Sequence, residues 1–123
     1  MTESKHKICV VGSGNWGSAI ARIIGMNTIK NSHIFEPIVK MFVHDEPINV
    51  DGQQHMLAQY INEFHCNLKY LPNIELPKNV VAINEMSKAV AGATILVFCL
   101  PHQFLSSTCD QIVKSMNSSA ISE

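Results

Sequence analysis

Residues 8–17 decide the fold of this chain, and they read Ile8-Cys9-Val10-Val11-Gly12-Ser13-Gly14-Asn15-Trp16-Gly17. Four apolar residues typical of a buried strand lead into a G-x-G-x-x-G loop, and the residues that follow have the pattern of a helix. In this context the first glycine allows a tight turn, the second lets the backbone approach a pyrophosphate, and the third lets helix and strand pack closely. The stretch therefore predicts a strand–loop–helix unit that binds a dinucleotide.

Strand and helix patterns alternate along the rest of the chain, which is typical of βαβ units and a mainly parallel sheet. We expect strands at 7–11, 38–43, 80–83 and 94–100, helices at 15–24, 54–64, 85–91 and from 104 to about 115, a polar connection at 26–37, and the start of a fifth strand at 120–123. Gly25 and Gly92 are expected to end helices, and Asn84 to cap one. The predicted fold class is α/β, a Rossmann-like, doubly wound sheet with its strands in the order 3-2-1-4.

Composition indicates one domain, or one piece of a larger protein: the chain has 123 residues, of which 46% are hydrophobic. A net charge of −1, from nine basic and ten acidic residues, leaves no basic patch for nucleic acid. The longest strongly apolar stretch, 95–100, is far shorter than the roughly 20 residues that span a membrane, and residues 1–7 lack the apolar part of a secretion signal. We therefore expect a soluble, cytoplasmic protein without nucleic-acid or membrane partners.

The cysteines and histidines do not have the spacing of a metal site. Cys9, Cys66, Cys99 and Cys109 form no C-x-x-C pair, and the six histidines form no H-x-x-x-H pair. Cys9 and Cys99 fall inside predicted buried strands, where a free thiol behaves as a small hydrophobe. We expect reduced, structural cysteines and no bound metal.

The predicted sheet brings three distant segments to the carboxyl ends of its strands, where ligands bind in this fold. They are the loop at 12–17, the end of the second strand at Asp45, and the turn after the fourth strand at 101–104. The start of the first helix offers unpaired N–H groups and a positive dipole end, so two phosphates can bind without a cationic side chain. The side chain of Trp16 is interpreted as a packing residue. Phe104 either packs on the cofactor or is a core contact of the last helix.

Asp45 and Glu46 favour NAD over NADP. NAD needs a carboxylate for its adenine-ribose hydroxyls, whereas NADP usually needs an arginine for its extra phosphate, and no Lys or Arg occurs between Lys40 and Lys69. Asp45 lies 28 positions after Gly17, more than the usual spacing of about 20, and the connection at 26–37 is expected to absorb the difference. Alternatively, Asp45 is a solvated acid at the strand end.

The chain resembles cytosolic NAD-dependent glycerol-3-phosphate dehydrogenases over nearly its whole length. The opening segment 7–21 is similar to that of the family, and further similar blocks follow in the same order: Lys69-Tyr70-Leu71-Pro72, 76–82, Pro101-His102-Gln103-Phe104 and Cys109-Asp110-Gln111. The resemblance implies reversible hydride transfer between NADH and dihydroxyacetone phosphate, giving sn-glycerol 3-phosphate. It also implies that the full-length protein is a homodimer.

Carried over residue by residue, the resemblance implies that the loop at 12–17 binds the pyrophosphate and that Phe104 contacts the cofactor. His44 stands where the family usually has an aromatic residue against the adenine. His102 invites a general-base role, but no acidic partner is recognisable and we treat it as structural. The candidate cofactor-binding residues are Gly12, Ser13, Gly14, Asn15, Trp16, Gly17, His44, Asp45 and Phe104.

Family members continue past the equivalent of Ile121-Ser122 into a lysine-containing segment and a helical domain that carries their catalytic groups. We therefore expect residues 1–123 to be an incomplete NAD-binding domain, truncated before the C-terminal helical domain, with no catalytic residues of its own. The fourth strand then becomes an exposed edge, and we expect low solubility and weak NAD affinity. Two alternatives stay open: a truncated isoform that binds NAD(H) or pairs with full-length subunits, and another phosphate- or acid-linked dehydrogenase.

Overall fold

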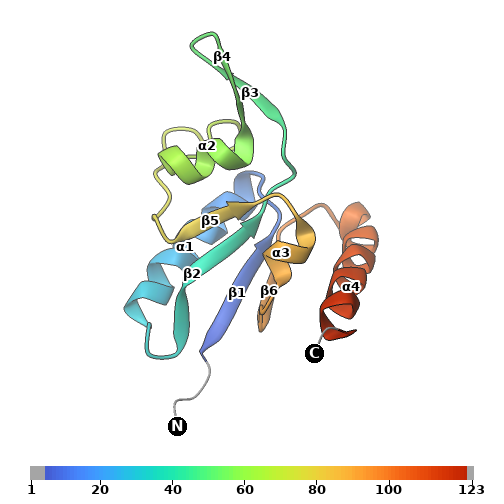
Figure 1. Ribbon diagram of the computed structural model, residues 1–123. Helices are drawn as coiled ribbons and strands as arrows, with labels where there is room; N and C mark the ends of the chain where they lie inside the picture. Colours follow the sequence, from blue (N-terminus) through green and yellow to red (C-terminus); the bar gives the residue numbers. More distant parts are fainter. Residues whose placement is uncertain (1–4, 122–123) are drawn as a thin grey trace.

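A computed structural model of the chain describes residues 5–121, with side chains up to residue 115 (Figure 1). Its elements are β1 (His6–Val11), α1 (Asn15–Lys30), β2 (Phe35–Phe42), β3 (Pro47–Val50), β4 (Gln53–Met56), α2 (Leu57–Phe64), β5 (Val80–Ile83), α3 (Met86–Val90), β6 (Ile95–Phe98), the 3-10 turn η1 (His102–Phe104) and α4 (Leu105–Ile121).

Four parallel strands form the sheet, in the order β5-β2-β1-β6. Val10 in the central strand β1 lies opposite Met41 of β2 and Val97 of β6. The predicted α/β class, the parallel sheet and the order 3-2-1-4 are confirmed. Within the described residues β6 is an edge strand, as expected.

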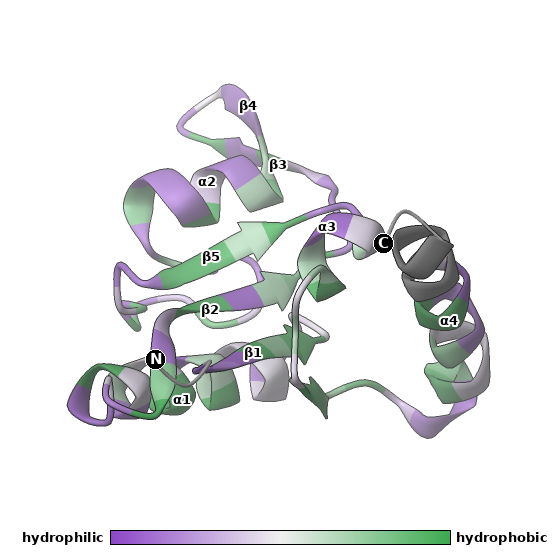
Figure 2. Ribbon diagram, turned by 60° about the horizontal axis from the view of Figure 1, so that its bottom comes forward, coloured by the Kyte–Doolittle hydropathy of each residue, from purple (hydrophilic) through white to green (hydrophobic). Residues whose placement is uncertain are grey.

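Helices cover both faces of the sheet, so the fold is doubly wound. Residues such as Val10, Val39 and Met41 face one core, to which α1 and α2 contribute Ala21 and Ile61. The opposite face packs on α3 and α4. Figure 2 shows hydrophobic residues along the strands and hydrophilic ones over much of the outer surface of α2 and the tip of the β3–β4 hairpin. Because successive side chains of a strand point to opposite faces of the sheet, the same strands contribute residues to both cores.

Gly25 does not end the first helix, which continues to Lys30. The predicted helix end and the polar connection at 26–37 are therefore wrong. Gly25 is buried against β5, and a Cβ on it would lie 2.8 Å from Cγ2 of Val80. The glycine thus permits close helix–strand packing and keeps a helical backbone. The longer helix and the earlier start of β2 at Phe35 account for the wide spacing before Asp45.

A β-hairpin of β3 and β4 occupies residues 47–56, for which the sequence analysis predicted no strand and, from residue 54, the first turn of a helix. Its turn is Asp51-Gly52, both with positive φ (51° and 82°), which matches the tight hairpin turn that an Asp-Gly pair favours. The predicted helix at 54–64 is confirmed only from Leu57 onward. In Figure 1 the hairpin projects beyond the body of the domain above α2.

The last third of the chain departs from the prediction at its boundaries. β6 is shorter than expected and only half-buried, although a strand covered on both faces was predicted. Asn84 does not cap α3, whose N-cap is Glu85 without a side-chain hydrogen bond. Residues 120–121 are the last of α4 and do not begin a strand, while 122–123 lie outside the described residues.

Candidate functional site

The glycine loop after β1 has two glycines that the packing requires and one that faces open space. Gly12 has φ +121°, and a Cβ on it would lie 2.2 Å from the carbonyl oxygen of Cys99. A Cβ on Gly17 would lie 2.2 Å from the carbonyl oxygen of Gly12. Around Gly14, in contrast, no heavy atom lies within 4 Å of such a Cβ. The loop is therefore closed toward the protein and open on the side where a ligand can approach.

The first turn of α1 opens onto this space without a protein partner. Gly14 is the N-cap residue, no side chain caps the helix, and no acidic residue stands in its first turn. The first backbone N–H groups of a helix have no intrahelical acceptor, and here Ser18 is the first residue that donates back, to the carbonyl oxygen of Gly14 at 2.9 Å. Free N–H groups and the helix dipole together attract an anion such as a diphosphate.

Trp16 does not pack as expected. Its side chain is 78% exposed, because it lies on the outer side of the first turn while Gly17 and Ser18 face the sheet. Asn15 is exposed as well, whereas Ser13 is buried.

A buried asparagine, Asn67, which the sequence analysis did not identify, is hydrogen-bonded to the glycine loop from the protein interior. Asn67 has no exposed surface, and its Nδ2 donates to the carbonyl oxygen of Ser13 and to Oγ of Ser18, both at 2.8 Å. Ser18 Oγ in turn donates to the same carbonyl at 3.1 Å. Nothing in the local pattern around Asn67 indicates this contact, because its partners are about 50 positions earlier in the chain.

The predicted segments lie together at the carboxyl ends of the parallel strands. Val11, the last residue of β1, pairs with Phe42 of β2 on one side and Phe98 of β6 on the other. His44 is exposed just beyond β2. Phe104 is 53% exposed at the end of η1, so the alternative that it is a core contact of the last helix is wrong within this chain.

Asp45 is a hydrogen-bonded acceptor and not a solvated acid. Its Oδ1 accepts from the backbone N–H groups of Glu46 at 3.1 Å and of Ala58, in the first turn of α2, at 3.0 Å. Its Oδ2 accepts from Nδ2 of Asn84 at 2.8 Å, the residue that was expected to cap α3. A carboxylate has about four acceptor positions, so three bonds leave one for a further donor such as a ribose hydroxyl.

Glu46 forms an ion pair with Lys69, a cation that the sequence spacing did not place here. The OH of Tyr70 also donates to Glu46 Oε2 at 2.9 Å. The hydrogen bond from Lys69 holds the pKa of Glu46 below its ordinary value, and the same bond raises the pKa of Lys69. Because this ammonium is already neutralised by Glu46, it adds little attraction for the extra phosphate of NADP.

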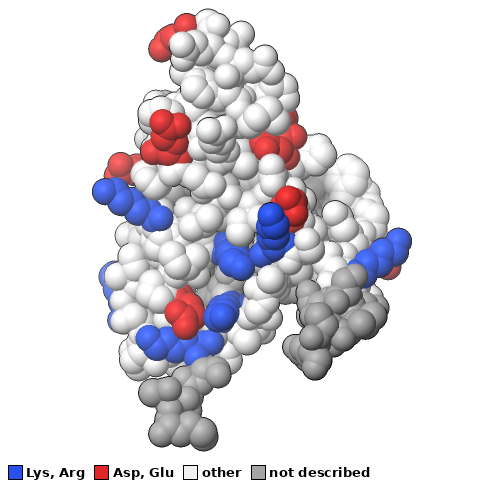
Figure 3. Space-filling view, viewed as in Figure 1, with Lys and Arg blue, Asp and Glu red and all other residues white. Residues whose placement is uncertain are grey.

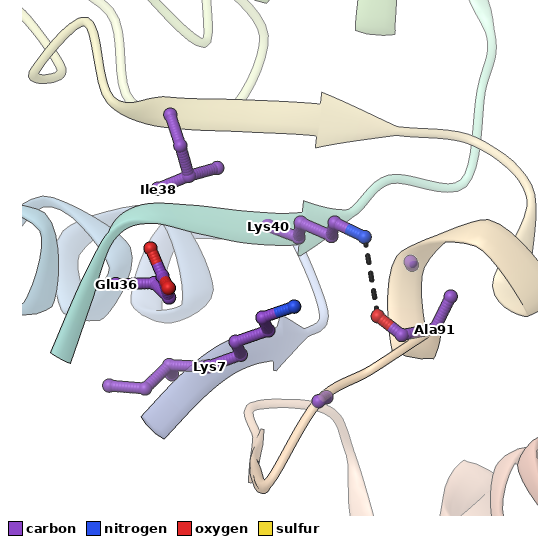
Figure 4. A pocket seen from close by; sticks show the side chains of 8 residues that line it. Lys7, Glu36, Ile38, Lys40 and Ala91 are labelled. Carbon is purple, nitrogen blue, oxygen red and sulfur yellow. Dashed lines mark hydrogen bonds between the residues drawn. The ribbon is translucent and has the colours of Figure 1, made fainter. Parts of the chain in front are cut away.

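A separate hollow of about 280 Å³ lies at the amino ends of the strands, on the α3 face (Figure 4). Lys7, Glu36, Ile38 and Lys40 line it, and Lys40 Nζ donates to the carbonyl oxygen of Ala91 at 3.4 Å. Figure 3 shows basic side chains near the middle of this face, with an acidic one beside them. The hollow is remote from the glycine loop and is no part of the candidate site.

Cys9 is a small buried core residue, and the other three cysteines are half-buried. All four are free, and burial raises the pKa of Cys9 to about 11 and also raises that of Cys99. Cys99 lies just past β6 and is half-buried, not inside the strand as predicted. Among the described residues no group of three or more His, Cys, Asp and Glu side chains is placed to hold a metal ion. Within the same part of the chain no helix has the length and apolarity needed to span a bilayer.

The parallel strand order, the glycine loop after the first strand and the helix that starts from it define a Rossmann-type α/β domain. Residues 7–122 match the family described as NAD-dependent glycerol-3-phosphate dehydrogenase N-terminus. The chain therefore belongs to this NAD-dependent family, which confirms the predicted resemblance and cofactor.

Relatives and solved structures agree with this assignment. The chain is 46% identical over 119 residues to glycerol-3-phosphate dehydrogenase [NAD(+)] 1 of Schizosaccharomyces pombe, covering 97% of this chain and 31% of that protein. It is 48% identical over 115 residues to glycerol-3-phosphate dehydrogenase [NAD(+)], cytoplasmic, of Rattus norvegicus, covering 94% of this chain and 32% of that protein. The structure of glycerol-3-phosphate dehydrogenase from Saccharomyces cerevisiae superimposes with a TM-score of 0.80 at 41% identity, covering 89% of this chain and 30% of that one. The chain thus spans about a third of the length of these relatives.

Proposed function

We propose that the glycine loop and the residues at the carboxyl ends of β2 and β6 bind NAD(H), and that residues 1–123 form the NAD-binding part of a glycerol-3-phosphate dehydrogenase. One observation carries this proposal: the start of α1 is uncapped and has open space at Gly14, which is the arrangement that attracts a diphosphate. When bound, NADH supplies a hydride to a carbonyl substrate, dihydroxyacetone phosphate in the reaction that we propose for the whole protein.

Each part of the cofactor has a matching group in this proposal. The amides at Gly14, Asn15 and Trp16 receive the diphosphate, and the remaining acceptor position of Asp45 takes a hydroxyl of the adenine ribose. The exposed imidazole of His44 stacks on the adenine, and Phe104 contacts the opposite end of the cofactor. Stacking of this kind requires only a planar π system, which histidine shares with the larger aromatic residues.

We further propose that this chain does not reduce dihydroxyacetone phosphate by itself. A free cationic side chain strengthens the binding of a substrate phosphate, but Lys69, the cation beside the end of β2, is paired with Glu46. The sole arginine, Arg22, donates its Nε to the carbonyl oxygen of Glu75 at 3.3 Å. Substrate binding and hydride transfer would then belong to the remainder of a longer, homodimeric protein. A cytoplasmic location is part of the same proposal, supported by the name of the rat relative.

The test uses Trp16, the only tryptophan of the chain, as a reporter in the first turn of α1. Indole emission overlaps the absorption of the reduced nicotinamide ring, so bound NADH should quench Trp16 by energy transfer. We expect saturable but weak binding of NADH, weaker binding of NADPH, and no oxidation of NADH when dihydroxyacetone phosphate is added. Absence of saturable quenching would overturn the cofactor assignment, and steady turnover would overturn the proposed inactivity.

A second function, a non-catalytic partner of full-length subunits, is favoured by the edge strand β6. Its side chains are only half-buried, Phe98 is 40% exposed, and the strand has no neighbour on its outer side within the described residues. Such an edge can pair with a strand of another chain, or aggregate. Co-purification of the tagged chain with a full-length dehydrogenase subunit would support this function, and separate elution of the two at micromolar concentration would argue against it.

A further inference from the structure

The buried side chain of Asn67 reaches the glycine loop from a segment far along the chain. Its two Nδ2 hydrogens are used by the carbonyl oxygen of Ser13 and by Oγ of Ser18, and its Oδ1 accepts from the backbone N–H of Tyr70 at 3.2 Å. The amide is therefore bonded on both ends and has no exposed surface. Such an arrangement fixes the orientation of whatever it binds, because a buried polar group that loses its partner is costly.

The carbonyl that Asn67 holds belongs to the peptide unit between Ser13 and Gly14. In a trans peptide the C=O and N–H groups point in opposite directions within one plane. Holding the Ser13 carbonyl toward the buried Asn67 therefore turns the N–H of Gly14 away from Asn67. The orientation of one loop amide is thus set by a side chain that the ligand does not touch.

The same short segment also reaches the other half of the site. Tyr70 donates its OH to Glu46, Lys69 pairs with the same carboxylate, and the backbone of Leu71 closes the turn with a 2.8 Å bond to the carbonyl oxygen of Asn67. Glu46 is the residue after Asp45, to which the ribose is assigned. Residues 67–71, which we name the tether, therefore connect the diphosphate loop to the end of β2.

We propose that Asn67 is a positioning residue for NAD(H), and that the tether sets the spacing between the diphosphate and adenine-ribose halves of the site. The inference rests on the proposed cofactor function and goes beyond it by assigning affinity to a residue without a cofactor contact.

The test compares NADH affinity and thermal stability in Asn67→Asp and in the matched control Asn79→Ala. The aspartate has the shape of asparagine but offers no Nδ2 donor, so the Ser13 carbonyl keeps only Ser18 Oγ as a donor and faces a carboxylate oxygen in place of the amide. Asn79, which is partly buried, is likewise an asparagine whose Nδ2 donates to backbone carbonyls, those of Gly25 and Pro37, at the opposite end of the domain. We expect N67D to weaken NADH binding about tenfold or more, while N79A lowers the melting temperature without changing NADH affinity.

Two milder variants keep the test decisive if N67D does not fold. Ser18→Ala removes one donor to the Ser13 carbonyl, and Tyr70→Phe removes only the bond to Glu46. We expect each to weaken NADH binding about two- to fivefold with the fold retained. If the folded variants bind NADH as tightly as wild type does, the positioning role of Asn67 is overturned. The cofactor function still stands in that case, because the wild-type chain binds NADH. No binding by the wild-type chain would instead overturn the cofactor function itself, and the inference with it.

Discussion

The strands β1, β2 and β5 are more deeply buried than β6 at the edge of the sheet, and we call the part of the domain around these three strands the firmly held side. Around β1, β2 and β5, the core against α1 and α2 contains fully buried residues such as Met41, Leu57 and Ile61. Around β6, the strand is half-buried, and α4 packs mainly on α3 rather than on the sheet, with Ile112 as its contribution to the buried core. In Figure 2, α4 accordingly stands apart from the strands.

This difference divides the proposed cofactor site as well. The diphosphate and adenine ends lie on the firmly held side, where the tether, Asp45 and Glu46 form a network of hydrogen bonds. The nicotinamide end lies beside β6, where Phe104 is exposed. We infer that recognition of the cofactor's nucleotide end is built into these residues, and that the reacting end depends on further contacts.

The largest effect is expected from substitutions in the glycine loop. Gly12→Ala places a Cβ 2.2 Å from the carbonyl oxygen of Cys99, which would force β1 and β6 apart, and it also strains a positive φ. We expect a loss of about 4 kcal/mol or more in the free energy of unfolding, or no folded protein at all. Urea unfolding followed by circular dichroism measures it.

Gly14→Ala is the matched control, because its Cβ meets nothing within 4 Å and its φ of −70° suits alanine. We expect stability to change by no more than about 1 kcal/mol, because the lower entropy of the unfolded chain is offset by the poorer fit of alanine at an N-cap, while NADH binding is lost because the methyl group fills the space for the diphosphate. Equal NADH affinity in G14A and wild type would show that the open space at Gly14 is not the diphosphate site.

The second prediction measures the difference between the two sides directly. Ile61→Ala, in the fully buried core of α2, should lower the free energy of unfolding by about 2–5 kcal/mol. Leu96→Ala, in half-buried β6, removes side-chain atoms that are partly solvated already, so we expect about 1 kcal/mol. Similar losses for both variants would mean that β6 is as well packed as the rest of the sheet.

The sequence predicted the parts of this fold that depend on local pattern and composition. The apolar runs at β1 and β5 and the glycine loop are local patterns, and the strand order follows from the Rossmann-like fold class that the glycine loop indicates. Gly25 misled the prediction because a glycine that ends a helix and one that lets a helix approach a strand look alike locally, and only the contact with Val80 distinguishes them. The hairpin had a readable signal in Asp51-Gly52, but its polar second strand resembled a helix start.

The candidate site was predictable only where its residues follow a motif. The glycines and Asp45 stand at motif positions, whereas Asn67 and Lys69 reach the site through tertiary contacts that no spacing rule expresses. Asn84 illustrates the same point, because its side chain donates a hydrogen bond to Asp45 and does not cap the adjacent helix α3. Side chains that support a site from a distant segment are therefore the ones that sequence reasoning misses.

The smallest effect is expected from Glu46, which joins the tether to the end of β2. Its pKa is lowered in the folded chain, chiefly by Lys69, so the contribution to stability is present above the carboxyl's unfolded pKa and is lost as pH falls through the folded value. Lys69 has the opposite sign: its raised pKa gives a contribution that is lost only in strong alkali. Between these limits, the melting temperature of wild type should be slightly higher than that of Glu46→Gln. This difference should disappear in acid, where the carboxylate is protonated.

The melting temperatures of wild type and E46Q, measured from pH 3 to pH 8 at low and high salt, test this assignment. Added salt should reduce the difference in melting temperature at neutral pH, since Lys69 is exposed, Glu46 is partly exposed, and the Debye length falls to about 3 Å at 1 M. Tyr70→Phe supplies the control, because it removes a neutral donor from the same carboxylate and should show a gap that salt leaves unchanged. If the difference in melting temperature persists at pH 3, Glu46 stabilises the domain by packing. The ion pair with Lys69 then does not contribute to the stability of the firmly held side.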